Sequence, residues 1–303
     1  MRKKIIIDTD PGHDDALAIM LLAKSGTVDI EAITTVAGNA TIAEVTNNAR
    51  FIADLIGLNV PIFSGAEKPL ARPLIQAVVH GSGGLAGVTV TKKEKLTGNA
   101  AEKIIEIVRK NPGEISLVVI GPETNIAKAF LKDPIVPTLV KQLVIMGGTI
   151  EAPGNKNRVG EFNIFVDPEA AKVVFDAPVR KILVPLDQCN NIPLFMEDFR
   201  KLKGSPLYRP IIFMMREFIK GISQFENTKG ALVYDALAAY FMVNPKAVTL
   251  KSMDLRIETK GELTRGMTVA DRRNWGQKNP NVDVVVGIDR SAFIRDFISL
   301  LSK

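Results

Sequence analysis

Short apolar runs rich in β-branched residues alternate with helical patterns through about the first 190 residues of the chain. This alternation is typical of strands joined by crossover helices in a largely parallel sheet. Because they are almost continuously apolar, five runs are predicted to be buried strands, at residues 4–8, 30–36, 115–120, 142–146 and 181–185. Helices are predicted between them, at residues 14–24, 42–58, 99–109, 125–131 and 168–175.

The pattern changes after Pro193. It then predicts helices at 196–203, 210–222 and 232–242, short strands near 255 and at 282–286, and a closing helix. The glycine- and proline-containing stretch at 147–160 is expected to be a loop, and no segment resembles a linker. We therefore predict a single α/β domain, residues 1–303, with a mainly parallel central sheet flanked by helices in a Rossmann-like arrangement. Such sheets bind ligands beyond the carboxyl ends of their strands.

Composition excludes several functional classes. The net charge of +6 comes from lysines and arginines spread along the chain, so no nucleic-acid partner is predicted. The apolar start at residues 5–7 is too short for a signal peptide and no apolar run reaches ~18 residues, so no membrane segment is expected. The single cysteine, Cys189, suits a reducing compartment and is expected in the core. We predict a cytoplasmic protein.

Four aspartates lie within eight residues, directly after the first strand and at the start of the first helix: Asp8, Asp10, Asp14 and Asp15. Like charges ~4 Å apart repel by roughly 1 kcal/mol in water and about 4 kcal/mol at a dielectric near 20, so converging carboxylates need a shared proton or a cation. Oxygen ligands without Cys or His favour calcium or magnesium over zinc, and flexible carboxylate geometry favours calcium. The alternative is that Asp8 and Asp14 cap the helix in a solvated loop.

Two members of this segment are predicted to have no chemical role. Asp8 ends the strand on the face opposite Thr9 and is expected to be structural. His13, flanked by acids in a turn, is expected at the surface.

A phosphatase is a second interpretation of the same segment. The Asp-Thr-Asp run at 8–10 after a buried strand also fits the nucleophile loop of haloacid-dehalogenase-like phosphatases. Thr34 or Thr35 could supply the hydroxyl group that such an enzyme needs. The late acidic pair of these enzymes is missing from the sequence.

Motifs along almost the whole chain resemble the inosine-uridine-preferring nucleoside hydrolases. Besides the run at 8–15, they are ITTVAGN at 33–39, HGSGG at 80–84, GPETNIA at 121–127, MGG at 146–148, EFN at 161–163 and GMTVAD at 266–271. They follow the family's order across about 260 residues, which makes coincidence implausible. The resemblance implies calcium-dependent hydrolysis of the N-glycosidic bond of ribonucleosides to free base and ribose, a role in nucleoside salvage and catabolism, and a homodimer or homotetramer.

The resemblance also implies a metal site. Asp10, Asp15 and Asp235 match the calcium-binding carboxylates, and the backbone carbonyl of Ile120 is a further implied ligand. Asp10 matches the general base that activates a calcium-bound water for attack on the anomeric carbon. The chemistry agrees, because Asp235 lies in the apolar run 231–239, where an ionised carboxylate is costly unless it is paired or metal-bound. A buried helix N-cap is the alternative for Asp235.

Six residues match the family's sugar pocket: Asp14, Asn39 and Asn163 at the ribose 2′- and 3′-hydroxyls, Asn155 and Glu161 near the 5′-hydroxyl, and Met146 lining the pocket. On chemistry alone, Asn39 and Asn155 could equally be turn residues, because each follows a glycine. Met146 could equally be a core residue at a strand end.

The base side departs from the family pattern. Many members carry a histidine directly before the last calcium aspartate, where it can protonate a departing purine, and here that residue is Tyr234. Tyrosine is a poorer proton donor at neutral pH. His80, in a glycine-flanked loop that could close over the base, is the preferred donor, and loop ordering is its alternative role. Trp275 could stack on the base or pack against other side chains of the protein. Phe218 and Ile222 could face the base or lie in the helix core. A nucleoside-binding protein with weak catalysis is therefore the alternative function.

Overall fold

The structure is a computed structural model that describes residues 2–88, 90–91, 93–225, 228–276 and 278–303. Within these residues, eight strands form one sheet in the order β3-β2-β1-β4-β5-β6-β10-β7, and only β7 runs antiparallel to its neighbour. The strands are β1 Lys3–Thr9, β2 Val28–Thr35, β3 Ile62–Ser64, β4 Ser116–Val119, β5 Gln142–Met146, β6 Lys181–Val184, β7 Val248–Met253 and β10 Val282–Ile288. The predicted α/β fold with a mainly parallel central sheet is confirmed.

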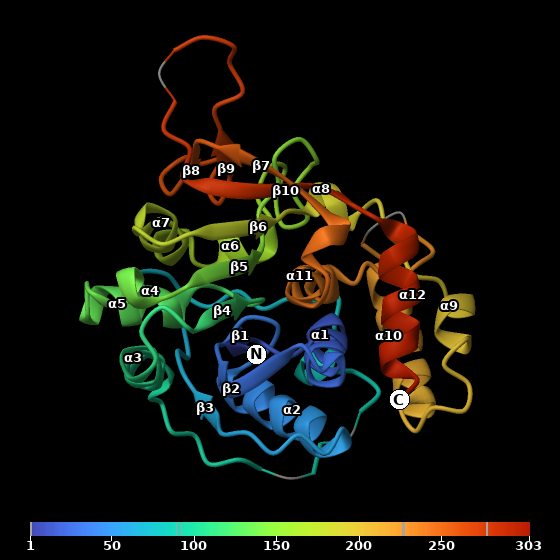
Figure 1. The fold of residues 1–303 in the computed structure, drawn as a ribbon. Helices are drawn as coiled ribbons and strands as arrows, with labels where there is room; N and C mark the ends of the chain where they lie inside the picture. The colour runs from blue at the N-terminus through green and yellow to red at the C-terminus, as the bar shows by residue number, and fades with distance from the viewer. Residues whose placement is uncertain (1, 89, 92, 226–227, 277) are drawn as a thin grey trace.

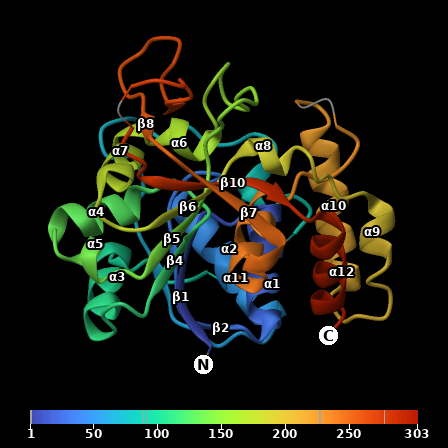
Figure 2. The ribbon, with the colours of Figure 1, turned by 45° about the horizontal axis from the view of Figure 1, so that its top comes forward.

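Helices cover both faces of the sheet (Figure 1; Figure 2). One face carries α1 His13–Ser25, α2 Ile42–Leu55, α10 Tyr208–Ile222, α11 Tyr234–Val243 and α12 Arg290–Leu301. The other face carries α3 Ala100–Lys110, α4 Thr124–Lys132, α5 Val136–Leu139 and α7 Pro168–Asp176. Each layer therefore encloses its own apolar core against the sheet.

Strand β1 shows how the sequence produces these two cores. Ile5 and Ile7 belong to the cluster that contains α1, whereas Ile6 belongs to the cluster that contains α3 and α4. This follows from the alternation of side chains along a strand. All three are fully buried, and each such burial contributes roughly 1.5–3 kcal/mol. The carboxyl end of strand β1 is thus held at a fixed place between two packed layers of helices.

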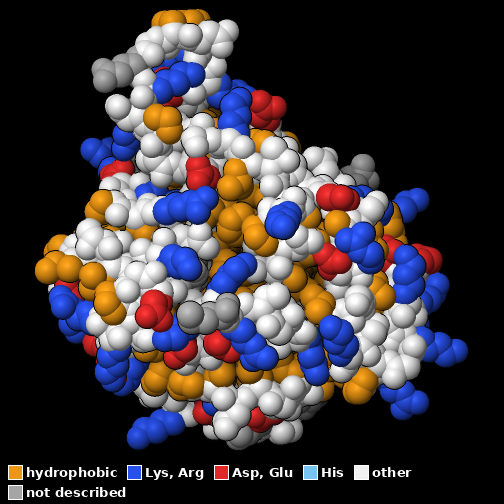
Figure 3. Space-filling view, in the orientation of Figure 1, with side chains coloured by type: hydrophobic (Ala, Val, Ile, Leu, Met, Phe, Trp, Pro, Cys, Tyr) orange, Lys and Arg blue, Asp and Glu red, His pale blue; other side chains and the backbone are white. Residues whose placement is uncertain are grey.

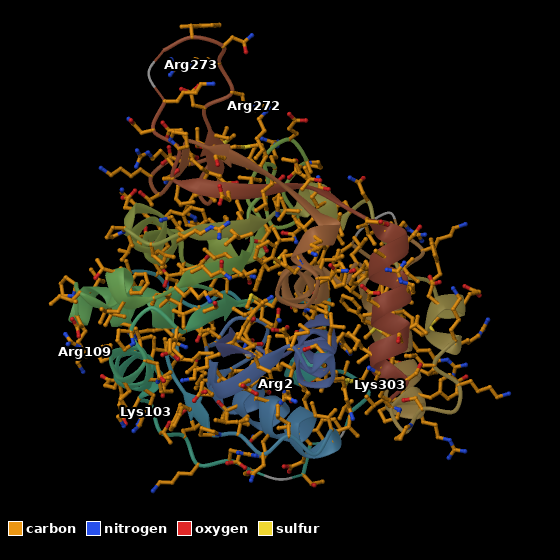
Figure 4. The ribbon with its side chains drawn as sticks, viewed as in Figure 1. Arg2, Lys103, Arg109, Arg272, Arg273 and Lys303 are labelled. Carbon is orange, nitrogen blue, oxygen red and sulfur yellow. The ribbon has the colours of Figure 1, made fainter. Side chains whose placement is uncertain are left out.

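Shorter elements connect the layers. They are α6 Phe162–Val166, α8 Leu186–Cys189, α9 Met196–Arg200, the 3-10 turns η1 Ser82–Gly84 and η2 Pro245–Ala247, and a hairpin of β8 Leu255–Ile257 and β9 Thr268–Ala270. The chain that follows the hairpin projects from the top of the molecule, with Arg272 and Arg273 on it (Figure 4). Lysines and arginines are scattered over the face in Figure 3 rather than gathered in one patch.

Most predicted elements are found within a few residues of their expected ends, and the differences have physical causes. Strand β3 was not predicted because it has only three residues, and β7 because its side chains alternate between half-buried and exposed. Within the predicted loop 147–160 the described chain has no helix or strand. Cys189 is fully buried, as predicted. No helix among the described residues is long and apolar enough to cross a membrane.

Candidate active site

A cavity of about 370 Å³ opens at the carboxyl ends of β1, β4 and β5. Ten of the twelve predicted site residues line it: Asp14, Asn39, His80, Ile120, Met146, Asn155, Glu161, Asn163, Tyr234 and Asp235. The other two, Asp10 and Asp15, adjoin it through hydrogen bonds to Asn39. The structure therefore brings the whole predicted set together.

The floor of the cavity is acidic. Asp14 and Asp15 lie in the first turn of α1, and Asp235 lies in the first turn of α11, which packs against α1. One carboxylate oxygen from each of these three residues falls within 4.8 Å of the other two. Asp10 lies close enough for the charges of Asp15 and Asp14 to raise its pKa. We call Asp10, Asp14, Asp15 and Asp235 the carboxylate floor.

Hydrogen bonds hold two of these carboxylates in place and leave specific oxygens unused. Asp15 accepts from the Thr9 hydroxyl at 2.5 Å and from the Gly12 N–H at 2.9 Å. Asp10 Oδ2 accepts from the Asn39 N–H at 2.7 Å. Asp10 Oδ1 and Asp14 Oδ1 are buried without a hydrogen-bond partner among the described residues. Orphaned buried oxygens of this kind are unfavourable unless a ligand or ion satisfies them.

The electrostatics lead to the same conclusion. Burial, followed by the negative charge of Asp15, raises the pKa of Asp14 to about 8. Burial and the neighbouring carboxylates hold the pKa values of Asp10 and Asp235 well above the usual range. Burial also raises the pKa of Asp15. The carboxylate floor thus needs protons or a cation, and its ligand atoms are the hard oxygens that suit calcium or magnesium.

Two glycines make room for the Asp10 carboxylate. A Cβ atom at Gly38 would lie 2.1 Å from Asp10 Oδ2, and one at Gly121 would lie 2.7 Å from Oδ1. Both distances are shorter than van der Waals contact, so a larger residue at either position would displace the carboxylate. Glycine is therefore required for steric reasons at both of these motif positions, because any side chain there would overlap the Asp10 carboxylate.

The opposite wall is built from side chains tied to the ends of β4 and β5. Asn163 Nδ2 donates to the carbonyls of Ile120 and Met146, at 3.3 Å each. Glu161 caps α6 by accepting from the N–H groups of Asn163 at 3.0 Å and Ile164 at 3.3 Å, and it also accepts from the Gly148 N–H at 3.0 Å. Burial raises its pKa to about 7. Asn155 Oδ1 accepts from the Phe162 N–H at 2.9 Å. These hydrogen bonds tie the wall to the ends of β4 and β5 and to α6.

The two histidines lie together beside the cavity. His13 is fully buried and its Nδ1 lies 3.2 Å from Nδ1 of His80, which is also buried. The prediction that His13 lies at the surface is wrong, because the loop that carries His80 folds over the first turn of α1. His80 Nε2 lies 3.9 Å from Asp14 Oδ1. Burial lowers the pKa of His13 to about 4 and that of His80 well below its usual value.

The remaining residues considered for the base side lie in different places. Tyr234 lines the cavity next to Asp235. Phe218 and Ile222 lie in the helix core and do not line the cavity, although Phe218 stacks on the His80 ring. Trp275 is 71% exposed and does not line the cavity, so in this structure it neither reaches the cavity nor packs in the core.

Asp8 is part of the fold and not of the site. Its Oδ1 accepts from the Thr34 hydroxyl at 2.5 Å and from Asn125 Nδ2 at 2.8 Å. The Thr35 hydroxyl pairs with that of Thr46 at 2.7 Å. Both threonines that could have supplied the phosphatase hydroxyl group are therefore committed to buried structural hydrogen bonds.

Sequence reasoning missed the rim of the cavity. Val78, Lys156, Asn190 and Phe225 line it, and Val78 and Phe225 are 60% and 59% exposed. We call these four residues the rim. They lie on loops or at the end of a short helix, where no motif marks them. The only signal was the apolar pair directly before His80.

Comparison with known proteins places this fold and cavity among hydrolases of ribonucleosides. A solved plant nucleoside hydrolase aligns with a TM-score of 0.92 and 29% identity, over 100% of this chain and 99% of its own. The inosine-uridine preferring nucleoside hydrolase of Crithidia fasciculata is 37% identical over 302 residues, 97% of this chain and 95% of its own. The pyrimidine-specific ribonucleoside hydrolase RihA of Salmonella typhimurium is 33% identical over 303 residues, 97% and 96% of the two chains. The class is that of N-glycosyl hydrolases.

The family is shown by a match to a family model across nearly the whole chain. The family model described as inosine-uridine preferring nucleoside hydrolase matches residues 5–295. The chain belongs to this family, and the resemblance predicted from its motifs is confirmed. The names of the relatives differ in the bases they specify, so family membership leaves the preferred base open.

Proposed function

We propose that the protein hydrolyses the N-glycosidic bond of ribonucleosides in a calcium-dependent reaction that releases free base and ribose. The observation that carries the proposal is the carboxylate floor, in which buried acids from α1 and α11 converge at the bottom of one cavity. Two of its buried oxygens have no hydrogen-bond partner among the described residues. The relatives named as nucleoside hydrolases supply the reaction class.

The residues fit a calcium ion. Asp10, Asp15 and Asp235 would hold it together with the backbone carbonyl of Ile120, a donor set made only of oxygens. The hydrogen bonds from Thr9 and Gly12 to Asp15 fix the orientation of one such ligand. When bound, calcium would supply positive charge that lowers the pKa of the attacking water and anchors the ribose hydroxyls.

Asp10 is suited to act as the general base. Its Oδ2 is held by the Asn39 N–H, and its Oδ1 has no hydrogen bond within the described chain. One oxygen therefore fixes the carboxylate while the other is left to take a proton from the attacking water. Gly38 and Gly121 keep this geometry, because a side chain at either position would overlap the Asp10 carboxylate and displace it.

The ribose would lie between the carboxylate floor and the opposite wall. Asp14 Oδ1, which has no hydrogen-bond partner among the described residues, and Asn39, which lines the cavity, would contact the 2′- and 3′-hydroxyls. Asn163 uses its Nδ2 on two strand-end carbonyls, which leaves its Oδ1 for the sugar. These oxygens also stabilise the positive charge that develops on the ring as the glycosidic bond breaks.

The departing base needs a proton, and two residues of the cavity can supply it. His80 Nε2 faces the cavity beside Asp14, and Tyr234 lines the same cavity next to Asp235. We favour His80, because its Nε2 lies 3.9 Å from Asp14 Oδ1, and an ionised Asp14 would favour the protonated ring that can give up a proton.

The proposal is tested by identifying products. Purified protein with added calcium is offered uridine, cytidine, inosine and a panel of modified nucleosides, and free base and ribose are quantified by chromatography. We expect both products, in equal amounts, from at least one nucleoside. Tight nucleoside binding by calorimetry without any turnover would instead establish the alternative, a nucleoside-binding protein.

A further inference from the structure

Three aromatic rings from three separate parts of the chain meet beside the cavity. His13 lies in α1, Phe218 in α10, and His80 in the loop between β3 and α3. Their ring centroids are 5.3–5.5 Å apart and their planes differ by 5–18°. Each residue is at most 6% exposed. The three centroids form a nearly equilateral triangle, so the His80 ring is held against both of the other rings.

One edge of the His80 ring is engaged by His13. His80 Nδ1 lies 3.2 Å from His13 Nδ1 and accepts from the His13 backbone N–H at 3.4 Å. The other nitrogen, Nε2, lies on the cavity side, 3.9 Å from Asp14 Oδ1. Whichever ring holds the proton between the two Nδ1 atoms, Nε2 is the nitrogen of His80 that meets a ligand.

His13 is itself anchored to the same loop. Its Nε2 lies 3.1 Å from the Ala86 carbonyl, which can only accept, so this nitrogen carries a hydrogen. The Ala86 N–H in turn donates to the His80 carbonyl at 3.0 Å. A Cβ atom at Gly12 would lie 2.7 Å from His80 Nδ1, so the glycine before His13 is required for this close approach.

We propose that His13 is a positioning residue, which holds the His80 ring so that Nε2 points at the departing base. This inference rests on the proposed N-ribohydrolase function. A third group that orients a catalytic imidazole is a general device of enzymes that transfer protons. In the step itself, the protonated His80 ring gives its Nε2 proton to the base as the C1′–N bond breaks and that bond's electron pair passes to the base, which leaves His80 neutral. The water oxygen bonds to C1′, and the water proton passes to Asp10.

Three substitutions of His13 separate positioning from general support. In His13→Asn the amide occupies the place of Nδ1 and keeps a partner for His80. In His13→Gln the amide reaches the place of Nε2, so the bond to Ala86 is kept and the contact with His80 is lost. His13→Phe keeps the ring stack and loses both polar contacts. The melting temperature of each variant is measured to check that the variant is folded.

Two substrates identify the step that is affected. The leaving group of a nucleoside is a base that must be protonated. The leaving group of p-nitrophenyl β-D-ribofuranoside is a stable phenolate that needs no proton. We expect His13→Phe and His13→Gln to lose on the order of 10²-fold in kcat/KM on nucleosides and to stay within about twofold of wild type on the nitrophenyl riboside. We expect His13→Asn to keep most nucleoside turnover.

The outcomes that contradict positioning are distinct. Equal losses on both substrates would mean that His13 only supports the fold, and unchanged nucleoside turnover in His13→Phe would remove any role. The double variant His13→Phe with His80→Phe should be no slower than His80→Phe alone, because the two residues act as one unit. Additive losses would overturn the proposal. A wild-type protein inactive on both substrates would instead reject the proposed function itself.

Discussion

The carboxylate floor and the rim are built in opposite ways. No carboxylate of the floor is more than 4% exposed, and Asp10 and Asp15 are tied by hydrogen bonds to the start of α1 or the loop after β2. Val78 and Phe225 of the rim are more than half exposed and lie on loops. A buried charge must be satisfied to be tolerated, whereas an exposed apolar side chain can be exchanged at little cost. If the proposed function holds, the side that binds the sugar is therefore fixed by the fold, whereas the side that meets the base can be exchanged at little cost to stability.

The largest expected effect is on catalysis from the floor. Asp10→Asn keeps the size and the Asn39 contact but cannot take a proton, so kcat should fall by about 10³- to 10⁴-fold. Nucleoside binding, measured by calorimetry, should change far less. The matched control is Asp29→Asn, an exposed aspartate that pairs with Arg2, which should keep wild-type kcat. A fall in kcat of less than tenfold in Asp10→Asn would show that Asp10 does not act as the base in the reaction.

The second effect concerns pH and metal. The unfolded chain ionises its carboxyl groups near their usual pKa, whereas folded Asp14 and Glu161 hold protons to about pH 8 and about pH 7. The metal-free folded state binds more protons in this window, so its free energy of unfolding falls as pH rises from about 4 to about 8. The melting temperature of chelator-treated protein should drop by several degrees over the upper part of this window.

Calcium should oppose that drop, because it binds the ionised carboxylates of the folded state only. Saturating calcium should raise the melting temperature more at about pH 8 than at about pH 6. Asp15→Asn is the matching control, since it removes one proposed ligand and should lose most of the calcium-dependent rise. A metal-free melting temperature that increases with pH would contradict this account of the floor.

A third effect tests the division of roles among the first aspartates. Asp8→Ala leaves the Thr34 hydroxyl and the Asn125 amide without their acceptor, which should lower the free energy of unfolding by roughly 2–3 kcal/mol. Urea denaturation measures this loss. At a temperature where the variant is folded, kcat should stay within about threefold of wild type. A loss of kcat as large as that of Asp10→Asn would place Asp8 in the reaction.

The smallest effect is expected at the rim. Phe225→Ala removes apolar surface at the mouth of the cavity, so KM should rise by about tenfold for the preferred nucleoside and less for others. Turnover of p-nitrophenyl β-D-ribofuranoside should not change. Equal changes across all substrates would show that Phe225 acts on the sugar side instead.

The sequence was informative where burial left little freedom. The strands with continuously apolar runs were predicted because a strand covered on both faces requires such a run. Asp235 was identifiable for the same reason, as a carboxylate inside an apolar segment. The motif glycines Gly38 and Gly121 lie against Asp10, which the sequence could indicate only through the family resemblance.

Contacts between distant loops could not be predicted. The burial of His13 depends on the loop that carries His80 and Ala86, and nothing local to His13 in the sequence indicates that this loop covers it. The exposure of Trp275 depends on a projecting segment after β9. The rim has the same origin, since Val78 and Phe225 come from distant loops and line one cavity only in the folded chain. The cytoplasmic location and the homo-oligomeric state remain predictions.

The central claim is that one calcium ion on the carboxylate floor is required for ribonucleoside hydrolysis. The most direct measurement titrates calcium into chelator-treated protein while bound calcium and ribose release from the preferred nucleoside are followed on the same sample. We expect no turnover without metal, and a rate that rises in proportion to bound calcium up to one ion per chain. Full turnover in the metal-free protein, or calcium that binds without restoring turnover, would contradict the claim.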